Sequence, residues 1–164
     1  MINIFGEEEF KPVIRYQREI PGYYVSMDGR IYSEKTNMIR SASTSMDYTS
    51  TGKKRLKNLK VDLDIPIGHY PDYSFRKRKK TDNTELITIP VHRAVMETWK
   101  PIDKNPPIPM EDWQMCPESA KQWIRDTAFV DHIDDDPSNN HVDNLRWVIP
   151  KDNEPNRKKR DQNS

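Results

Sequence analysis

The chain of 164 residues contains a single cysteine, Cys116, and no long run of apolar residues. One thiol cannot form an internal disulfide, and it excludes a zinc site built from several cysteines. No segment approaches the roughly 18 apolar residues of a transmembrane helix. The N-terminus carries acidic residues where a signal peptide needs a basic start. We therefore expect a protein without a membrane segment or membrane partner, located in the cytoplasm.

Apolar residues are also scarce overall. They make up 34% of the chain, against 32% charged residues and 13 prolines. Such a chain buries only a modest core, so part of its order is expected to come from a bound partner. The four Trp, seven Tyr and four Phe are nevertheless enough to anchor small sheets and short helices. The length fits one compact domain or two very small ones.

The net charge of +1 conceals an uneven distribution of charge. Residues 53–80 hold ten basic and three acidic residues, a net charge of +7. Residues 81–145 hold five basic and thirteen acidic residues (−8), and residues 146–164 hold six and three (+3). Basic stretches neutralise phosphate, whereas an acidic centre repels DNA unless a cation sits there. Charge runs are also typical of solvated surfaces, so the pattern alone leaves both interpretations open.

The N-terminal half shows the patterns of a small antiparallel sheet. Residues 1–18 have no clear period and are interpreted as an extended lead-in. Residues 19–34 predict a hairpin, because Asp28-Gly29 is a strong turn signal between two apolar runs. Residues 35–52 are rich in Ser, Thr and Asn and are interpreted as a loop.

Three further strands are predicted before the first helix. In residues 55–64 the alternation places Leu59, Val61 and Leu63 on one face of a strand. Residues 73–78 and 86–89 are expected to pair with each other. The resulting sheet would have one basic face, a shape suited to following a duplex backbone.

Two short helices are expected in the middle of the chain. Val91, Val95 and Trp99 recur at helical spacing, and Pro90 suits a helix start. Four prolines in residues 101–110 prevent that helix from continuing. Residues 117–127 predict a second helix, with Trp123 and Ile124 packing inward.

The segment 129–157 has the order strand, loop, strand, helix. Phe129 and Val130 begin a strand that ends at Asp131-His132, and residues 134–140 are rich in turn formers. Residues 144–149 alternate as a second strand, with Leu145, Trp147 and Ile149 on one face. Pro150 ends it, and a helix can begin around Asp152. The pattern predicts a ββα unit of about thirty residues.

This segment also brings together the groups that phosphodiester hydrolysis needs. A neutral imidazole with a pKa near 6.5 suits a base that activates water, which makes His132 a candidate. Mg²⁺ takes a few oxygen ligands and keeps several waters, and Asp131 with Asn153 meets that need. Asn144 on the second strand could fix the imidazole tautomer or could tie the loop together.

The segment resembles the HNH endonucleases, in particular phage intron-encoded and freestanding homing endonucleases. The matching residues are Asp131-His132, then Asn144 to Val148 (NLRWV), then Asn153. Asn144 lies twelve residues after His132, and Asn153 lies nine residues after Asn144. Asparagine at the last position is typical of the His-Asn-Asn variants. The resemblance implies that His132 is the general base, that Asp131 and Asn153 hold one divalent metal, and that Asn144 is structural. Upstream, residues 20–34 are similar to the NUMOD-type motif that often precedes these nucleases.

Two features bear on this interpretation. Pro155 cannot lie in a normal helix interior, so the helix has to begin around Asp152 or Asn153. Adjacent residues of a regular strand also face opposite sides, yet Asp131 and His132 would serve one site. The strand is therefore expected to end or bulge at this point.

The sequence thus predicts an α+β fold with an N-terminal antiparallel sheet module and a C-terminal ββα-metal nuclease unit. We expect a β-rich DNA-contacting module in residues 1–90, linking helices in residues 91–127, and the nuclease unit with a basic tail in residues 128–164. The expected activity is nicking or double-strand cleavage of double-stranded DNA, leaving 5′-phosphate and 3′-hydroxyl ends. One Mg²⁺ or Mn²⁺ per site, no organic cofactor, and a monomer or homodimer are expected.

Several residues are assigned narrower roles. Asp131 and Asn153 are the candidate metal ligands, and His132, Asn144 and Arg146 are the candidate catalytic residues. Arg146 could contact the scissile phosphate or form a surface salt bridge. The candidate DNA-contacting residues are basic and lie in two runs: Arg76, Lys77, Arg78, Lys79 and Lys80, and Arg157, Lys158, Lys159 and Arg160.

Other interpretations remain open. His141 lies nine residues from His132, and a zinc site of two histidines and an aspartate is conceivable, but thiolates are lacking. Asp134, Asp135 and Asp136 lack the spacing of a calcium loop and are interpreted as turn residues. His92 is interpreted as a packing or hydrogen-bonding residue. The whole chain could also be a former nuclease that only binds DNA, or an interaction protein unrelated to nucleic acid.

Overall fold

The computed structural model of the chain describes residues 2–5, 8–42, 46–48, 54–56, 58–71, 78–79 and 83–150. The strands of the N-terminal part are β1 (Ile2–Phe5), β2 (Glu8–Arg15), β3 (Arg18–Ser26), β4 (Ile31–Ser33), β5 (Met38–Arg40), β6 (Met46–Tyr48), β7 (Lys54–Leu56), β8 (Lys60–Pro66), β9 (Arg78–Lys79) and β10 (Thr84–Pro90). They are followed by helices α1 (Val91–Trp99), α2 (Met110–Met115) and α3 (Glu118–Thr127), strand β11 (Phe129–His132), the 3₁₀ turn η1 (Val142–Asn144) and strand β12 (Leu145–Val148). The expected α+β class is confirmed.

The strands form four small antiparallel groups. The largest is a five-stranded sheet in which each strand pairs with its neighbour in sequence, from β1 to β5. A second sheet has the order β8-β10-β9, and β6–β7 and β11–β12 are two-stranded pairs. The hairpin predicted for residues 19–34 is confirmed, since β3 pairs with β4 in the register Val25↔Ile31.

The lead-in over residues 1–18 is extended, as expected, but it also forms strands of the sheet, which the sequence did not predict. Strand β2 pairs with β3 from Phe10 to Arg15, and its side chains Phe10 and Val13 are fully buried. The register shifts between Pro12 and Ile14, where a β-bulge interrupts the alternation. This bulge explains why no period of two is visible in the sequence.

The segment 35–66 is more strand-rich than expected. β5 adds to the five-stranded sheet within the stretch interpreted as a loop, and β6 pairs with β7. In β8 the buried residues are Val61, Leu63 and Ile65, one strand step beyond the predicted set. β10 pairs with β8 over its whole length and with β9 at Glu85↔Lys79 and Leu86↔Arg78. Residues 72–77, which hold most of the predicted partner strand, lie outside the described residues.

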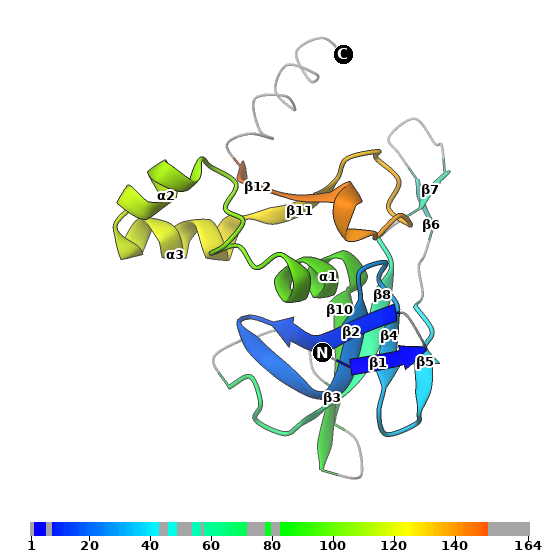
Figure 1. Cartoon of the computed structure of the whole chain (residues 1–164). Helices are drawn as coiled ribbons and strands as arrows, with labels where there is room; N and C mark the ends of the chain where they lie inside the picture. The colour runs from blue at the N-terminus through cyan, green and yellow to red at the C-terminus, as the bar shows by residue number, and fades with distance from the viewer. Residues whose placement is uncertain are drawn as a thin grey trace.

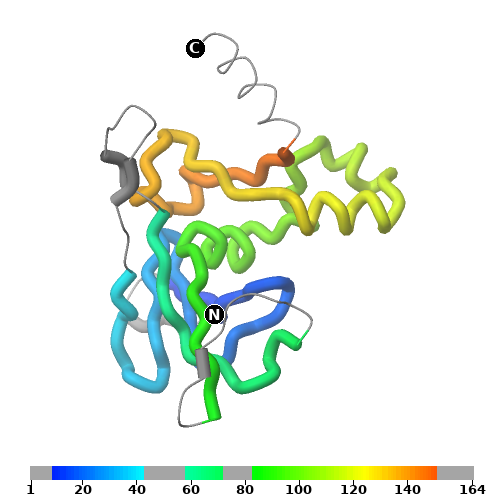
Figure 2. The backbone as a smooth tube through the Cα atoms, turned by 180° about the vertical axis from the view of Figure 1, so that it is seen from behind, coloured from blue at the N-terminus to red at the C-terminus, as the bar shows by residue number. Residues whose placement is uncertain are grey.

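Helix α1 occupies the predicted range and lies at the centre of the molecule, between the N-terminal strands and the β11–β12 pair (Figure 1; Figure 2 from behind). Its residues are buried on nearly all sides, including the polar His92 and Thr98. A helix buried all round belongs to a core. The N-terminal sheet is joined to it by hydrogen bonds from Ile14 N to Thr98 Oγ1 (2.9 Å) and from Trp99 Nε1 to Val25 O (3.1 Å).

Helices α2 and α3 lie beside β11 and β12 (Figure 1). The second predicted helix is confirmed as α3, and Ile124 is buried as expected. Trp123 is 52% exposed, so its predicted inward packing is wrong. Its place is taken by Trp113 of α2, a helix that the proline-rich stretch before it obscures in the sequence, and the guanidinium of Arg125 lies over this indole.

One hydrophobic core runs through the whole fold. It includes Val13 and Val25 of the five-stranded sheet, Val95 of α1, and Leu145 and Trp147 of β12. The site region is therefore anchored on the N-terminal sheet through α1. No helix in the described part of the chain is both long and apolar enough to cross a membrane.

Candidate active site

The strand β11 ends at the two residues predicted to carry the chemistry. It pairs with β12 in an unshifted antiparallel register, Asp131 opposite Arg146 and His132 opposite Leu145. Both residues lie within the regular part of the strand, which ends at His132, and no bulge separates them. Regular alternation places His132 on the face that contacts α1, which we call the inner face, and Asp131 on the opposite, outer face.

On the inner face, the imidazole of His132 is held by a buried amide. His132 is 8% exposed, and its Nε2 lies 2.8 Å from Oδ1 of Asn140, which is 4% exposed. An amide oxygen only accepts hydrogen bonds, so the ring donates from Nε2. The other ring nitrogen, Nδ1, makes no hydrogen bond to the described residues. The lone pair of the neutral ring is therefore on Nδ1.

A second imidazole packs against the first. The ring centroids of His92 and His132 are 5.2 Å apart, with the rings inclined by 57°. Burial lowers the pKa of His92 to about 3, with smaller contributions from Arg93 and from His132 when that ring is protonated. His92 is consequently neutral at physiological pH and adds no positive charge beside His132. Its buried Nδ1 has no hydrogen-bond partner among the described residues, which agrees with the expected packing role more than with a ligand.

On the outer face, the carboxylate of Asp131 forms an ion pair across the strand pair. Arg146 Nε donates to Asp131 Oδ2 at 2.9 Å, and the side chains of Arg146 and Asp131 are 61% and 31% exposed. Cross-strand partners at a directly opposed position are well placed for such contact. Of the two roles considered for Arg146, the structure shows the surface salt bridge, made with the candidate metal ligand.

Asn144 ties the loop between the two strands together. Its Nδ2 donates to Asp134 Oδ1 (2.8 Å) and to the backbone oxygen of Asn139 (2.9 Å), and its Oδ1 accepts from the backbone N–H of Asp134 (3.1 Å). The backbone N–H of Ile133 also donates to Asn144 O at 2.8 Å. Asn144 therefore crosslinks both ends of the loop, while the contact with His132 comes from Asn140.

The acidic residues of the loop act as turn residues. Hydrogen bonds from the Asn139 side chain, the Asp136 backbone and the Asn144 side chain lower the pKa of Asp134. Asp136 accepts from the hydroxyl and backbone N–H of Ser138, and these bonds lower its pKa as well. Such Asx-type bonds to residues just ahead are typical of turns.

The side chain of His141 makes a local hydrogen bond. Its Nδ1 accepts the backbone N–H of Asp143 at 3.1 Å, at the start of η1. Within the described residues, no group of three or more His, Cys, Asp or Glu side chains is placed to hold a metal. The conceivable zinc site is thus not assembled in the part of the chain that the structure describes.

Some predicted site residues cannot be placed. Asn153, Pro155 and the helix expected from Asp152 lie outside the described residues, and so does the basic run of Arg157, Lys158, Lys159 and Arg160. Arg76, Lys77 and Lys80 also lie outside them. Arg78 and Lys79 form the short strand β9 at the edge of the β8-β10-β9 sheet.

The sequence interpretation missed the role of Asn140. It lies among turn formers in the run SNNHVDN, where nothing in its own spacing separates it from Asn139. Burial separates them, because Asn139 is exposed and Asn140 is not. Only the folded loop shows that a residue eight positions after His132 can contact its ring.

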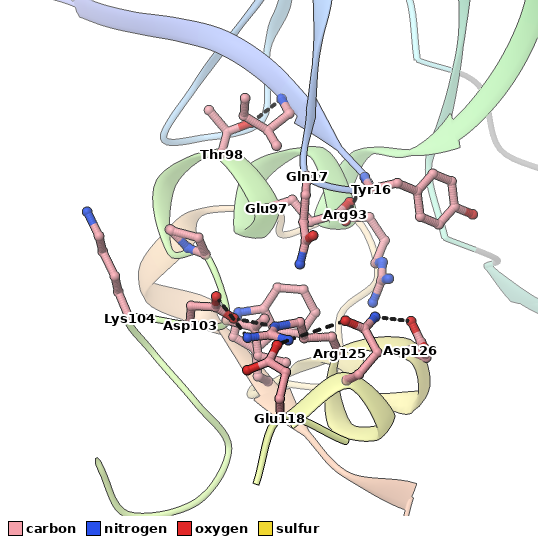
Figure 3. A pocket seen from close by; sticks show the side chains of 15 residues that line it. Tyr16, Gln17, Arg93, Glu97, Thr98, Asp103, Lys104, Glu118, Arg125 and Asp126 are labelled. Carbon is pink, nitrogen blue, oxygen red and sulfur yellow. Dashed lines mark hydrogen bonds and ion pairs between the residues drawn. The ribbon is translucent and has the colours of Figure 1, made fainter. Parts of the chain in front are cut away.

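A separate cavity of about 970 Å³ lies between α1, the β2–β3 turn and α3 (Figure 3). Among its lining residues, Arg125 pairs with Asp103 (2.7 Å) and Glu118 (2.6 Å), and Glu97 pairs with the neighbouring Arg15 (2.9 Å). Arg93 donates to the backbone oxygen of Ala128 (3.0 Å). Neither Asp131 nor His132 lines this cavity.

The described part of this segment is a strand pair with an aspartate and a histidine at the end of its first strand and an asparagine that closes its loop. We compared the chain with known families. Residues 102–154 match the family of HNH endonucleases, and this range contains Asp131, His132, Asn144 and Asn153. The resemblance of residues 20–34 to a NUMOD-type motif stays a prediction, because the match begins after them.

A solved structure described as DNA binding and cleavage by the HNH homing endonuclease I-HmuI is also similar. The similarity has a TM-score of 0.46 and 23% sequence identity, and it covers 93% of this chain and 59% of that chain. This chain thus spans about three fifths of the length of that structure. No curated protein sequence matches the chain.

Proposed function

We propose that the protein is a metal-dependent HNH endonuclease of the homing type that hydrolyses phosphodiester bonds in double-stranded DNA. The observation that carries the proposal is the arrangement at the end of β11. His132 is held through Nε2 with its Nδ1 lone pair unused by the described residues, and a partly exposed carboxylate, Asp131, precedes it. The match of this segment to the HNH endonuclease family supports the same activity.

His132 serves as the general base in this proposal. Its Nδ1 takes a proton from the water that attacks phosphorus, while Nε2–H stays bonded to Asn140 Oδ1. The neighbouring imidazole of His92 stays neutral, so that it does not repel the proton arriving on His132. Burial of the ring among α1 and η1 residues holds it in one orientation.

HNH nucleases use a divalent metal ion, and the residues present fit a hard cation such as Mg²⁺ or Mn²⁺. Asp131 supplies carboxylate oxygens at a partly exposed position, and Asn153 would supply an amide oxygen. One ion held by so few protein ligands keeps positions for water and for phosphate oxygens. When bound, it neutralises charge on the phosphate and on the leaving 3′ oxygen, which would give 5′-phosphate and 3′-hydroxyl ends.

Arg146 has a second role in the proposal. In the absence of DNA it neutralises Asp131. The pair is exposed, and such pairs contribute roughly 0–1 kcal/mol. Arg146 can therefore leave Asp131 at little cost and contact the scissile phosphate instead. The basic residues near 76–80 and 157–160 would neutralise flanking phosphates.

The test is cleavage of a supercoiled plasmid with Mg²⁺ or Mn²⁺. The wild-type protein is expected to convert it to the nicked or linear form. His132→Ala should slow this by about 10²- to 10⁴-fold, the usual contribution of a general base. His69→Ala is the matched control, because His69 lies far from the site in sequence and its ring contacts Glu19 O and Tyr70, neither of which belongs to the site. It should cut at the wild-type rate.

The outcomes separate the proposal from its alternatives. If wild type and His132→Ala both shift the plasmid on a gel and both leave it intact, the protein is a DNA-binding module. If neither binds the plasmid at low salt, or if binding ignores salt concentration, the protein does not act on nucleic acid. Equal cleavage by wild type and His132→Ala would show that His132 is not the base.

A further inference from the structure

The buried partner of His132 lies on a loop that the N-terminal sheet supports directly. Val142, two residues after Asn140, donates its backbone N–H to Met27 O at 2.8 Å. Met27 belongs to the turn of residues 27–30 between β3 and β4. The next contact is with Gly29, where an added Cβ would lie 3.1 Å from Asn140 Cβ and 3.0 Å from Val91 Cγ1. The turn is therefore packed against the residue that holds the imidazole.

We propose that Asn140, seated on the 27–30 turn, is a positioning residue that fixes the ring orientation and the Nε2–H tautomer of His132. This inference rests on the proposed function, because only a base needs its lone pair aimed at a water. The amide oxygen of Asn140 accepts and cannot donate. It thereby keeps the proton on Nε2 and the lone pair on Nδ1, the nitrogen that the described residues leave unused.

Burial lets this hydrogen bond select one orientation of the His132 ring. Asn140 and His132 are 4% and 8% exposed, so water competes poorly for either partner. A ring flip would place a carbon–hydrogen edge against the amide oxygen and leave a buried acceptor unpaired. The His92 ring packs against the imidazole, with the ring centroids 5.2 Å apart. The imidazole is consequently held by one polar and one packing contact.

The turn itself is stabilised by its own hydrogen bonds. Ser26 Oγ bonds Asp28 Oδ1 and accepts the backbone N–H of Arg30 (3.0 Å), and Gly29 N donates to Ser26 O (3.2 Å). Gly29 adopts a φ of +89°, which disfavours any side chain. The turn is thus a rigid platform whose closest approach to the site is possible only for glycine. The N-terminal sheet therefore contributes to the catalytic centre as well as to the predicted DNA contact.

The first experiment observes the ring proton in protein free of metal and DNA. In ¹⁵N-labelled wild type, we expect His132 Nε2–H as an imidazole proton in slow exchange with water. Asn140→Leu should lose this signal, whereas Asn140→Asp, which keeps an acceptor oxygen, should retain it. Asn105→Leu is the matched control at an exposed asparagine outside the loop, whose side chain bonds only the backbone of Pro101 among the described residues, and it should retain the signal too. A proton on Nδ1 in wild type, or an unchanged signal in Asn140→Leu, would overturn the proposal.

Steady-state kinetics of DNA cleavage provide a second measurement on the same variants. Because outer partners of catalytic groups typically contribute 10- to 100-fold, kcat of Asn140→Leu should fall by about that factor with KM for DNA unchanged. Asn140→Asp should recover most of the loss. A rise in KM with kcat unchanged would contradict a positioning role. If wild type does not cut DNA at all, the nuclease proposal fails, and the ring proton still decides the role of Asn140.

A glycine pair tests the contribution of the turn. Gly29 and Gly22 have nearly the same φ, +89° and +82°, but an added Cβ at Gly22 has nothing within 4 Å. Gly29→Ala and Gly22→Ala should both lower the melting temperature, because both force alanine into the left-handed region. Only Gly29→Ala should weaken the His132 Nε2–H signal and kcat. The same effect on the signal in both variants, or in neither, would refute the platform.

Discussion

The inner and outer faces of β11 hold their catalytic candidates in different ways. On the inner face, His132 is buried, bonded to a buried amide and packed against a neutral imidazole. On the outer face, Asp131 makes an ion pair with an arginine that is 61% exposed. The His132 side chain on the inner face is held in place before any ligand binds. The exposed ion pair of Asp131 on the outer face can instead be replaced by other partners at a small cost in free energy. The proposed base is thus fixed in advance, and the side chains proposed to meet metal and phosphate remain adjustable.

The largest effect expected on the outer face comes from Asp131→Ala. Loss of the carboxylate should reduce Mn²⁺ binding and slow plasmid cleavage by about 10²- to 10³-fold, since a metal contributes several kcal/mol to such reactions. Titration calorimetry with Mn²⁺ and the plasmid assay measure the two effects. Asp143→Ala removes the same charge at an exposed residue of the neighbouring turn. If both variants lose Mn²⁺ binding equally, local charge and not ligation is responsible.

The buried imidazole of His92, which packs against His132 on the inner face, should make the free energy of unfolding depend on pH. His92 has a folded-state pKa of about 3, against about 6.5 in the unfolded chain. Below pH 6.5 the unfolded state binds a proton that the folded state does not, so stability falls as the pH falls. This group alone accounts for up to about 2 kcal/mol between pH 6.5 and 5.

Urea unfolding at several pH values measures this effect. His92→Leu should flatten the decline below pH 6.5, because the variant has no proton to bind there. Met96→Leu is the control, since Met96 is a buried residue of the same helix that does not titrate, and its decline should match wild type. Parallel curves for wild type and His92→Leu would show that His92 is not buried in its neutral form.

The smallest effect is expected from Arg146→Ala. Removing one exposed partner of the pair with Asp131 should change the free energy of unfolding by no more than about 0.5 kcal/mol. If Arg146 contacts phosphate, the slope of log affinity for DNA against log salt should fall by about one. A large loss of stability would show that the outer face is as rigid as the inner one.

The sequence was sufficient to predict the elements that depend on local pattern. Helix α1, the β3–β4 hairpin and the strands around Asp131 and Arg146 follow from spacing and turn residues. β2 was missed because a bulge between Pro12 and Ile14 breaks its alternation. Trp123 was misplaced because the short helix α2 supplies Trp113 to the core instead.

The candidate site was predictable in part. The chemistry of the residue types and the family resemblance pointed to Asp131, His132 and Asn144, and both possible roles of Asn144 were considered. The structure assigns the loop crosslink to Asn144 and the imidazole contact to Asn140. That division depends on burial and on the 27–30 turn, more than a hundred residues away in sequence. No local pattern carries such tertiary information.

The central claim, that His132 is the general base, is tested most directly by chemical rescue. His132→Gly leaves a space of the size of the lost ring, and imidazole added to the reaction can occupy it. We expect His132→Gly to lose plasmid cleavage and imidazole to restore part of it in a concentration-dependent way, with no restoration in Asp131→Ala. Cleavage by His132→Gly at the wild-type rate without imidazole would contradict the account.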